Sequence, residues 1–114
     1  MTVADKNIDK ILQGIVEVIV EAIDPDKIIL FGSGASGNWG PDSDFDLLIV
    51  DSKPFGEGRS RRKVLGDLSR ALFDFEYPLD LLIFTREEVD EWKDSRNHII
   101  GRALREGRIL YERD

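Results

Sequence analysis

The sequence predicts an α/β (α+β) protein in which a small sheet is covered by helices. Three observations lead to this class: an apolar stripe with helical period near the N-terminus, short aliphatic runs bounded by Gly, Pro and Asp, and an alternation of such runs with further helical patterns. Alternating strands and helices are typical of a sheet packed against helices. A length of 114 residues fits one hydrophobic core, so we expect a single domain over residues 1–114.

The first element is expected to be an amphipathic helix over about residues 5–23. Apolar residues recur there at steps of three and four, which places them on one face: Ile8, Ile11, Leu12, Ile15, Val16, Ile19 and Ile23. The segment Asp24-Pro25-Asp26 should end the helix, because the residue before a proline disfavours the helical conformation.

Two strands are predicted next, over residues 27–31 and 45–50. Both are aliphatic and β-branched nearly throughout, which is typical of strands buried on both faces. The connection between them is rich in glycine, and we expect it to contain one helical turn.

The second half of the chain repeats the alternation. Ser60 is a candidate N-cap for a helix to about residue 75, with an apolar face composed of Val64, Leu65, Leu68, Leu72 and Phe73. Residues 79–84 read as a third strand, and Thr85 to Glu88 has the form of a capping box that opens a helix through Trp92. A last helix over residues 97–105 should end at Gly107, before a short strand over residues 109–111.

Composition excludes several classes of function. Sixteen Lys and Arg against 23 Asp and Glu give a net charge of −7, which disfavours nucleic acid as a ligand because that binding depends on phosphate neutralisation. There is no cysteine, so a disulfide framework and a thiolate zinc site are excluded. The acidic N-terminal residues and broken apolar pattern fit neither a signal peptide nor a membrane span, and we expect a cytoplasmic protein.

The candidate functional residues lie between the first two strands. Gly32-Ser33 is followed after ten residues by Asp44-Phe45-Asp46. Glycine lets main-chain N–H groups approach a phosphate closely, and Ser33 adds a hydroxyl. In a strand, Asp44 and Asp46 would present two carboxylates to the same side, and such a pair suits Mg²⁺ with phosphate oxygens as further ligands.

A third carboxylate, Asp80, is expected at the start of the third strand and would join the pair if that strand lies beside the second. Each feature also has an ordinary interpretation: a glycine turn is usually only a turn, and Asp-x-Asp is often a solvated entrance to a strand. The combination, with this spacing and with strands on both sides, favours a functional site.

At these residues the chain resembles the minimal nucleotidyltransferase (MNT) family, within the superfamily that includes DNA polymerase beta. The family motif is Gly-Ser, ten residues, Asp-x-Asp and a later strand Asp, matched here by Gly32, Ser33, Asp44, Asp46 and Asp80. The resemblance covers nearly the whole chain. It implies the nucleotidyltransferase fold, with a small mixed sheet covered by helices.

The resemblance also implies a reaction and roles for these residues. Gly32 and Ser33 would bind the phosphates of a nucleoside triphosphate, with ATP expected, and Asp44 and Asp46 would hold Mg²⁺. Asp80 would also ligate the metal, near the attacking hydroxyl, and help to take its proton. AMP would be transferred from the triphosphate to that hydroxyl as pyrophosphate leaves.

Stand-alone proteins of this family resemble antitoxins whose partner is a helical HEPN-domain protein, so a tyrosine hydroxyl on such a partner is an expected acceptor; a homo-oligomer is also considered. The chain departs from the family at Gly34 and Ser36, where arginines are common. Arginines and lysine at residues 59–63 could replace those cations, or could simply form a solvated helix start. The alternative function is a non-catalytic nucleotide-binding or partner-docking module of a toxin–antitoxin pair.

Overall fold

The structure, a computed structural model, describes residues 3–32, 45–75 and 77–113, with side chains from residue 8 onward within those ranges. Its elements, in chain order, are α1 (Val3–Ile23), β1 (Lys27–Phe31), β2 (Phe45–Asp51), α2 (Arg61–Ala71), β3 (Leu79–Thr85), α3 (Arg86–Trp92), α4 (Ile99–Glu106) and β4 (Arg108–Glu112). The predicted order of helices and strands is confirmed.

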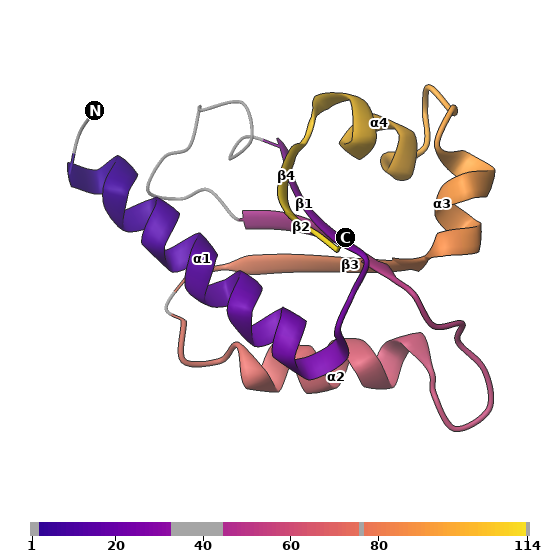
Figure 1. Ribbon diagram of the computed structural model, residues 1–114, viewed down its shortest axis with the longest axis horizontal. Coiled ribbons are helices and arrows are strands. Elements are labelled where there is room, and N and C mark those ends of the chain that lie inside the picture. Colours follow the sequence, from indigo (N-terminus) through magenta and orange to yellow (C-terminus); the bar gives the residue numbers. More distant parts are fainter. Residues whose placement is uncertain (1–2, 33–44, 76, 114) are drawn as a thin grey trace.

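The four strands form one mixed sheet in the order β3-β2-β1-β4. β1 is antiparallel to β2 and to β4, whereas β2 and β3 are parallel. The parallel pair is connected through α2, which lies along one face of the sheet (Figure 1). The expected α/β class, with a small mixed sheet covered by helices, is confirmed.

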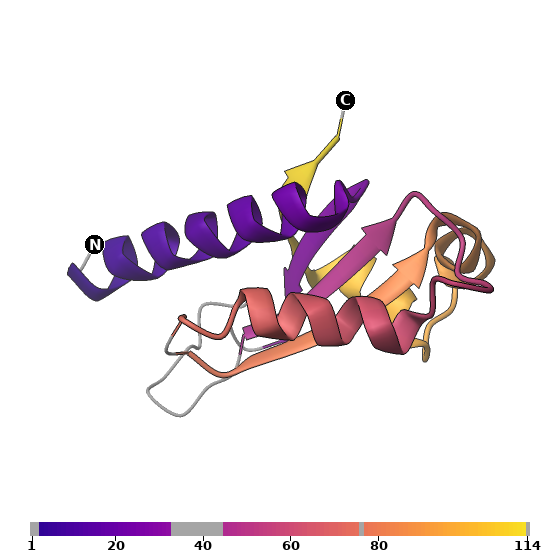
Figure 2. The same cartoon turned by 90° about the horizontal axis from the view of Figure 1, so that it is seen from below.

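Helices cover both faces of the sheet, as Figures 1 and 2 show. α1 and α2 pack on one face, where Ile15 and Leu68 belong to the larger buried cluster. α3 and α4 lie on the other face, where Ile100 and Ala103 of α4 pack against buried side chains of β1 and β2. β1 and β2 are therefore apolar along their length because they are buried on both sides, as predicted.

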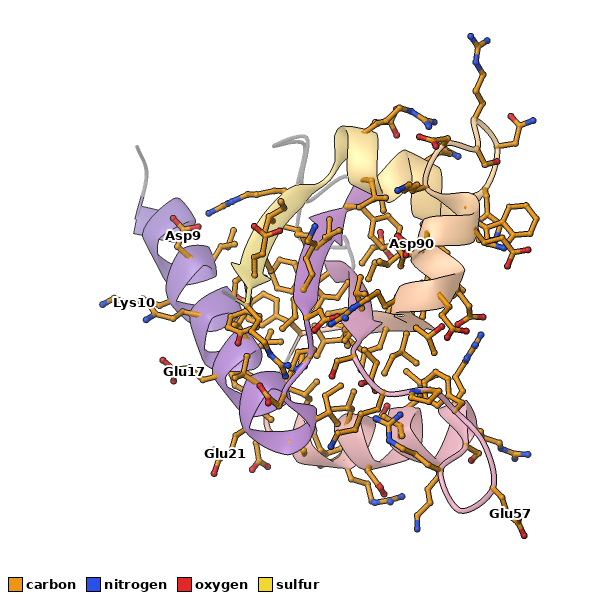
Figure 3. All side chains as sticks on the ribbon, turned by 45° about the vertical axis from the view of Figure 1, so that its right-hand side comes forward. Asp9, Lys10, Glu17, Glu21, Glu57 and Asp90 are labelled. Carbon is orange, nitrogen blue, oxygen red and sulfur yellow. The ribbon has the colours of Figure 1, made fainter. Side chains whose placement is uncertain are left out.

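The amphipathic pattern of α1 matches its position. Leu12, Ile15 and Ile19 are buried against the sheet. Figure 3 shows the polar side chains Lys10, Glu17 and Glu21 on the side of α1 that faces away from the sheet. No helix in the described part of the chain has both the length and the apolarity needed to cross a membrane.

Helix α2 begins as predicted and ends earlier. Ser60 is its N-cap and accepts a hydrogen bond from the backbone N–H of Lys63. The helix ends at Ala71 rather than near residue 75, and Phe73 is 84% exposed instead of lying on the apolar face. Val64, Leu68 and Leu72 already form the stripe at four-residue steps, and Phe73 follows the last of them by a single residue, which turns it away from the core.

The C-terminal helices start at well-defined caps. Thr85 and Glu88 form the predicted capping box at the start of α3. α4 begins two residues later than predicted, because His98 is its N-cap and its Nδ1 accepts a hydrogen bond from the N–H of Ile100 at 3.1 Å. Gly107 ends α4 as expected, and a Cβ there would lie 2.4 Å from a methyl carbon of Ile29. Glycine at this position thus lets the chain turn from α4 into β4 directly against β1.

Candidate functional site

Two of the predicted carboxylates lie side by side in the sheet. Asp46 of β2 and Asp80 of β3 are direct partners in the parallel register. Neighbouring strands are about 4.8 Å apart and residues in register point to the same side, so the two carboxylates emerge together. The third strand does lie beside the second, so the condition on which Asp80 would join the site is met for Asp46 and Asp80.

The pair faces the side of the sheet that α3 and α4 cover. Leu48 and Val50 of β2 and Phe84 of β3 belong to the apolar cluster on that face. Asp46 and Asp80 are an even number of residues from these side chains, so they share the face. Asp46 is half-buried, while Asp80 is exposed on the edge strand.

Gly32 lies against Asp46 immediately after β1. Phe31 pairs with Asp46 across the antiparallel ladder, and Gly32 has a φ of +74°. A Cβ at Gly32 would lie only 2.5 Å from Oδ2 of Asp46. The residue is therefore glycine for two reasons: the left-handed backbone, and the close approach of the Asp46 carboxylate.

Other predicted site residues fall outside the described ranges. These are Ser33 and Asp44; Gly34 and Ser36, where the chain departs from the family pattern, also lie outside the described ranges. The roles given to Ser33 and Asp44 remain predictions.

The donor set is suited to a hard cation. Asp46 and Asp80 contribute carboxylate oxygens, which are the ligands that Mg²⁺ prefers, usually one or two of them with phosphate and water oxygens. The described ranges contain no cluster of three or more His, Cys, Asp and Glu residues that could hold a metal. Asp44, the third predicted ligand, is not among the residues that the structure describes. The described part of the site thus fits a cation that shares its coordination with a bound phosphate.

The basic residues at the start of α2 are at the other end of the sheet. Arg59 forms an ion pair with the fully buried Asp51, the last residue of β2. Arg61 forms an ion pair with Glu88 at 2.6 Å. Asp51 is five residues along β2 from Asp46, or about 16 Å. These two arginines therefore stabilise the far end of the sheet, and the hypothesis that they replace the family's phosphate-binding cations is not supported.

The Arg61–Glu88 pair also shapes the electrostatics of that far end. Burial raises the pKa of Glu88, but hydrogen bonds from Arg61 and the Thr85 backbone outweigh it and hold the pKa below its ordinary value. The guanidinium of Arg61 also lies over the rings of Phe55 and Phe84, at 5.0 and 5.5 Å. The charge of Arg61 is thus already engaged by Glu88 and by the two aromatic rings.

A pocket that the sequence does not clearly reveal lies between the end of β1 and α4. Phe31 and Gly32 form one wall, and residues of α4 form the other: Ile99, Arg102, Ala103 and Glu106. The sequence indicates this pocket only weakly. In a helix of eight residues, the pattern of charged residues is too short to distinguish a ligand-binding side chain from one that only faces solvent.

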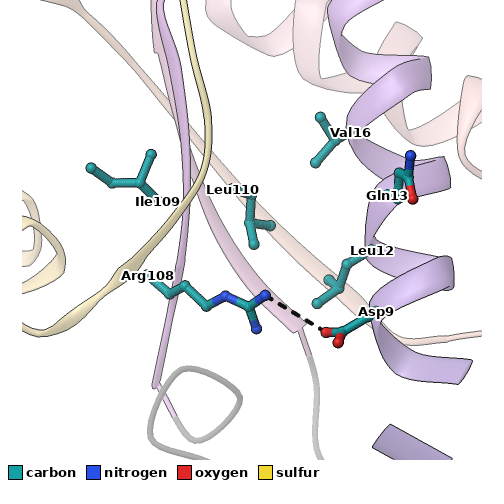
Figure 4. A pocket seen from close by; sticks show the side chains of 7 residues that line it. All are labelled: Asp9, Leu12, Gln13, Val16, Arg108, Ile109 and Leu110. Atoms are coloured by element: carbon teal, nitrogen blue, oxygen red, sulfur yellow. Dashed lines mark ion pairs between the residues drawn. The ribbon is translucent and has the colours of Figure 1, made fainter. Parts of the chain in front are cut away.

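A second pocket lies on the opposite face, between α1 and β4 (Figure 4). Leu12, Val16 and Leu110 supply apolar walls, and Arg108 and Asp9 pair across its mouth at 3.6 Å. The sheet separates this pocket from the carboxylate pair, so it is not part of the candidate site.

Known proteins with similar sequences identify the family of this chain. The family model of the polymerase beta nucleotidyltransferases matches residues 13–114, nearly the whole chain. The chain belongs to this family. Similarity to a protein of Methanocaldococcus jannaschii, provisionally named a protein adenylyltransferase, supports the assignment: 32% identity over 88 residues, covering 75% of this chain and 77% of that one. The expectation of an enzyme of the nucleotidyltransferase class is confirmed.

Solved structures confirm the fold of this nucleotidyltransferase. A protein from Sulfolobus solfataricus, provisionally named a nucleotidyltransferase, matches with a TM-score of 0.64 at 19% identity, over 94% of this chain and 82% of that one. A chain of a toxin–antitoxin crystal structure with AMP-PNP matches with a TM-score of 0.53 at 18% identity, over 89% of this chain and 73% of that one.

Proposed function

We propose that this nucleotidyltransferase is Mg²⁺-dependent and transfers AMP from ATP to a hydroxyl group on a partner protein. The observation that carries the proposal is the register of Asp46 and Asp80 on neighbouring strands, with Gly32 against the first of them. A glycine turn beside two oxygen donors suits a cation and a phosphate chain held together.

The residues of the site would have different roles in the reaction. Asp46 and Asp80 would hold Mg²⁺, which, when bound, neutralises negative charge on the phosphates. Gly32 leaves space for the Asp46 carboxylate, and its lack of a side chain would also let a phosphate approach the backbone of the turn. Asp80, exposed on the edge strand, is accessible to an acceptor from outside and would take the proton of its hydroxyl. A bond forms between that oxygen and the α-phosphorus, the bond to the bridging oxygen breaks, and pyrophosphate leaves.

The nature of the acceptor is supported by the relatives. One relative's name describes it as modifying a protein, and one structural neighbour is a toxin–antitoxin chain in a crystal structure with AMP-PNP. We therefore propose a tyrosine hydroxyl on a helical toxin of the HEPN type as the acceptor, and an antitoxin role for this chain. A homo-oligomer could supply further acceptor-binding surface.

A second candidate function is a partner-docking module without catalysis. It is favoured by Gly34 and Ser36, which stand where family members commonly carry arginines. Such a module would retain the fold and bind its partner without transferring a nucleotide.

One experiment separates the two functions. The purified protein is incubated with Mg²⁺, ATP labelled at the α-phosphate and the proteins encoded beside its gene. Label that appears on a neighbouring protein, with a mass increase of one AMP on a tyrosine, supports transfer. A stable complex without label supports docking, and the absence of both contradicts the antitoxin role.

Substitution of Gly32 by alanine is expected to remove Mg²⁺-dependent ATP binding. The added Cβ would displace the Asp46 carboxylate, and a left-handed backbone costs roughly 1–2 kcal/mol in a residue with a side chain. Gly58→Ala is the matched control, because Gly58 has a φ of +79° and no atom within 4 Å of an added Cβ. Thermal unfolding and calorimetric titration with ATP test both variants. We expect a similar loss of stability in both but a loss of binding only at Gly32; equal binding by the two variants would contradict the site.

A further inference from the structure

Arg102 lies beside the end of β1 that carries Gly32. It contributes to the same pocket as Phe31 and Gly32, from the facing side of α4. α4 is held in this position by its buried residues Ile100 and Ala103, which pack on the sheet. The helix thus presents a guanidinium at the mouth of the pocket, next to the predicted phosphate turn.

The charge of Arg102 is only lightly engaged within the fold. Its Nε lies 3.7 Å from an oxygen of Glu106, and the two side chains are 59% and 67% exposed. An exposed pair of this kind contributes little to stability. Arg105, the other arginine of α4, instead donates hydrogen bonds to the backbone oxygens of Ser95 and Arg96, at 2.9 and 3.0 Å. Of the two, Arg102 is the one available to a ligand.

The chain needs a cation at this place if it binds a triphosphate. Positions 34 and 36 are Gly and Ser, and Arg59 and Arg61 are paired at the far end of the sheet. Asp46, which lies against Gly32, and its neighbour in register Asp80 add negative charge at this end of the sheet. An anionic ligand at this end of the sheet would therefore gain from a guanidinium that can form charge-assisted hydrogen bonds to phosphate oxygens.

We propose that Arg102 binds the phosphate chain of the nucleoside triphosphate, and that Glu106 holds its guanidinium when no nucleotide is bound. This inference rests on the proposed function, since it names a further ligand of the same substrate. On binding, Arg102 exchanges an exposed carboxylate for phosphate oxygens. Glu106 opposes the substrate in two ways, by competing for Arg102 and by repelling phosphate.

The two residues therefore have opposite expected effects on affinity. Arg102→Ala should weaken Mg²⁺–ATP binding about 10-fold, which corresponds to the loss of one hydrogen bond to a charged group. The same substitution should change AMP binding by less than about 2-fold. Arg102→Lys should fall between, because lysine keeps the charge but not the planar fork. Glu106→Gln should tighten ATP binding by about 2- to 3-fold. A general loss of fold would not produce opposite signs at two residues one helical turn apart.

Calorimetric titration with ATP and with AMP in Mg²⁺ tests these effects. Arg62→Ala is the matched control, since Arg62 is an exposed helical arginine at the far end of the sheet, and its affinities should equal those of the wild type. The role of Arg102 would be overturned if Arg102→Ala left the ATP affinity unchanged, or lowered the affinities for ATP and AMP equally. If Asp46→Asn still removes ATP binding in that case, the proposed function stands and only the role of Arg102 fails. A wild-type protein that binds no ATP would overturn the proposed function as well.

Discussion

Replacing Asp46 with asparagine is expected to lower the rate of AMP transfer by at least about 100-fold. Loss of residues that merely support a metal ligand already costs 10- to 100-fold in many metal sites, and Asp46 would contact the cation itself. The amide keeps the size of the side chain beside Gly32 but removes the negative charge. Asp80→Asn should have a comparable effect, because the two residues are partners in register. Transfer of labelled AMP to the acceptor protein measures both.

The control for these variants is Asp90→Asn. Asp90 is an exposed carboxylate on α3, and its substitution makes the same change in net charge away from the pair. It should leave transfer unchanged. Full activity of Asp46→Asn with Mg²⁺ would show that Asp46 is a structural residue rather than a ligand.

Replacing Arg59 with alanine is expected to destabilise the protein by about 3 kcal/mol. Asp51 is fully buried, and its carboxylate is satisfied by Arg59 and by the backbone N–H of Lys53 at 3.0 Å. Removing the guanidinium would leave a buried charge without its counter-ion, which costs about 3–5 kcal/mol. Because Arg59 is partly exposed, we expect a cost at the low end of this range. The midpoint of thermal unfolding should fall by more than about 10 °C.

Arg62→Ala is again the control, since Arg62 is exposed in the first turn of α2, three residues after Arg59. It should change the free energy of unfolding by less than about 0.5 kcal/mol. At temperatures where the Arg59→Ala variant is folded, its ATP affinity should match the wild type, because the ion pair is at the opposite end of β2 from Asp46. An unfolding midpoint unchanged from the wild type would contradict the view that this ion pair stabilises the fold.

The fold was largely predictable because its elements carry local signals. The period of α1, the aliphatic runs of β1 and β2, and the capping box at Thr85 each depend on residues near one another in sequence. The end of α2 was predicted wrongly, because Phe73 is apolar but lies outside the stripe that ends at Leu72. Which strands are neighbours could only be posed as a condition, since pairing depends on contacts between distant segments.

The placement of the candidate residues was predictable where a motif defined it, and not where it depended on packing. Gly32, Asp46 and Asp80 came from spacing and strand context, and the structure brings them together. The basic cluster at the start of α2 was a misleading signal, since the sequence alone could not show that Arg59 faces Asp51. Arg102 was missed for the converse reason: its position beside Gly32 arises from the way α4 folds back over β1.

Asp46 and Asp80 are proposed together to bind the cation that accompanies a nucleoside triphosphate. A crystal structure of the protein with Mn²⁺ and a non-hydrolysable ATP analogue tests this proposal most directly, because the anomalous signal of manganese locates the ion independently of the protein. We expect a manganese peak within coordinating distance, about 2.0–2.2 Å, of carboxylate oxygens of both residues, with the phosphates next to Gly32. A nucleotide bound elsewhere, or a manganese ion that contacts neither Asp46 nor Asp80, would contradict it.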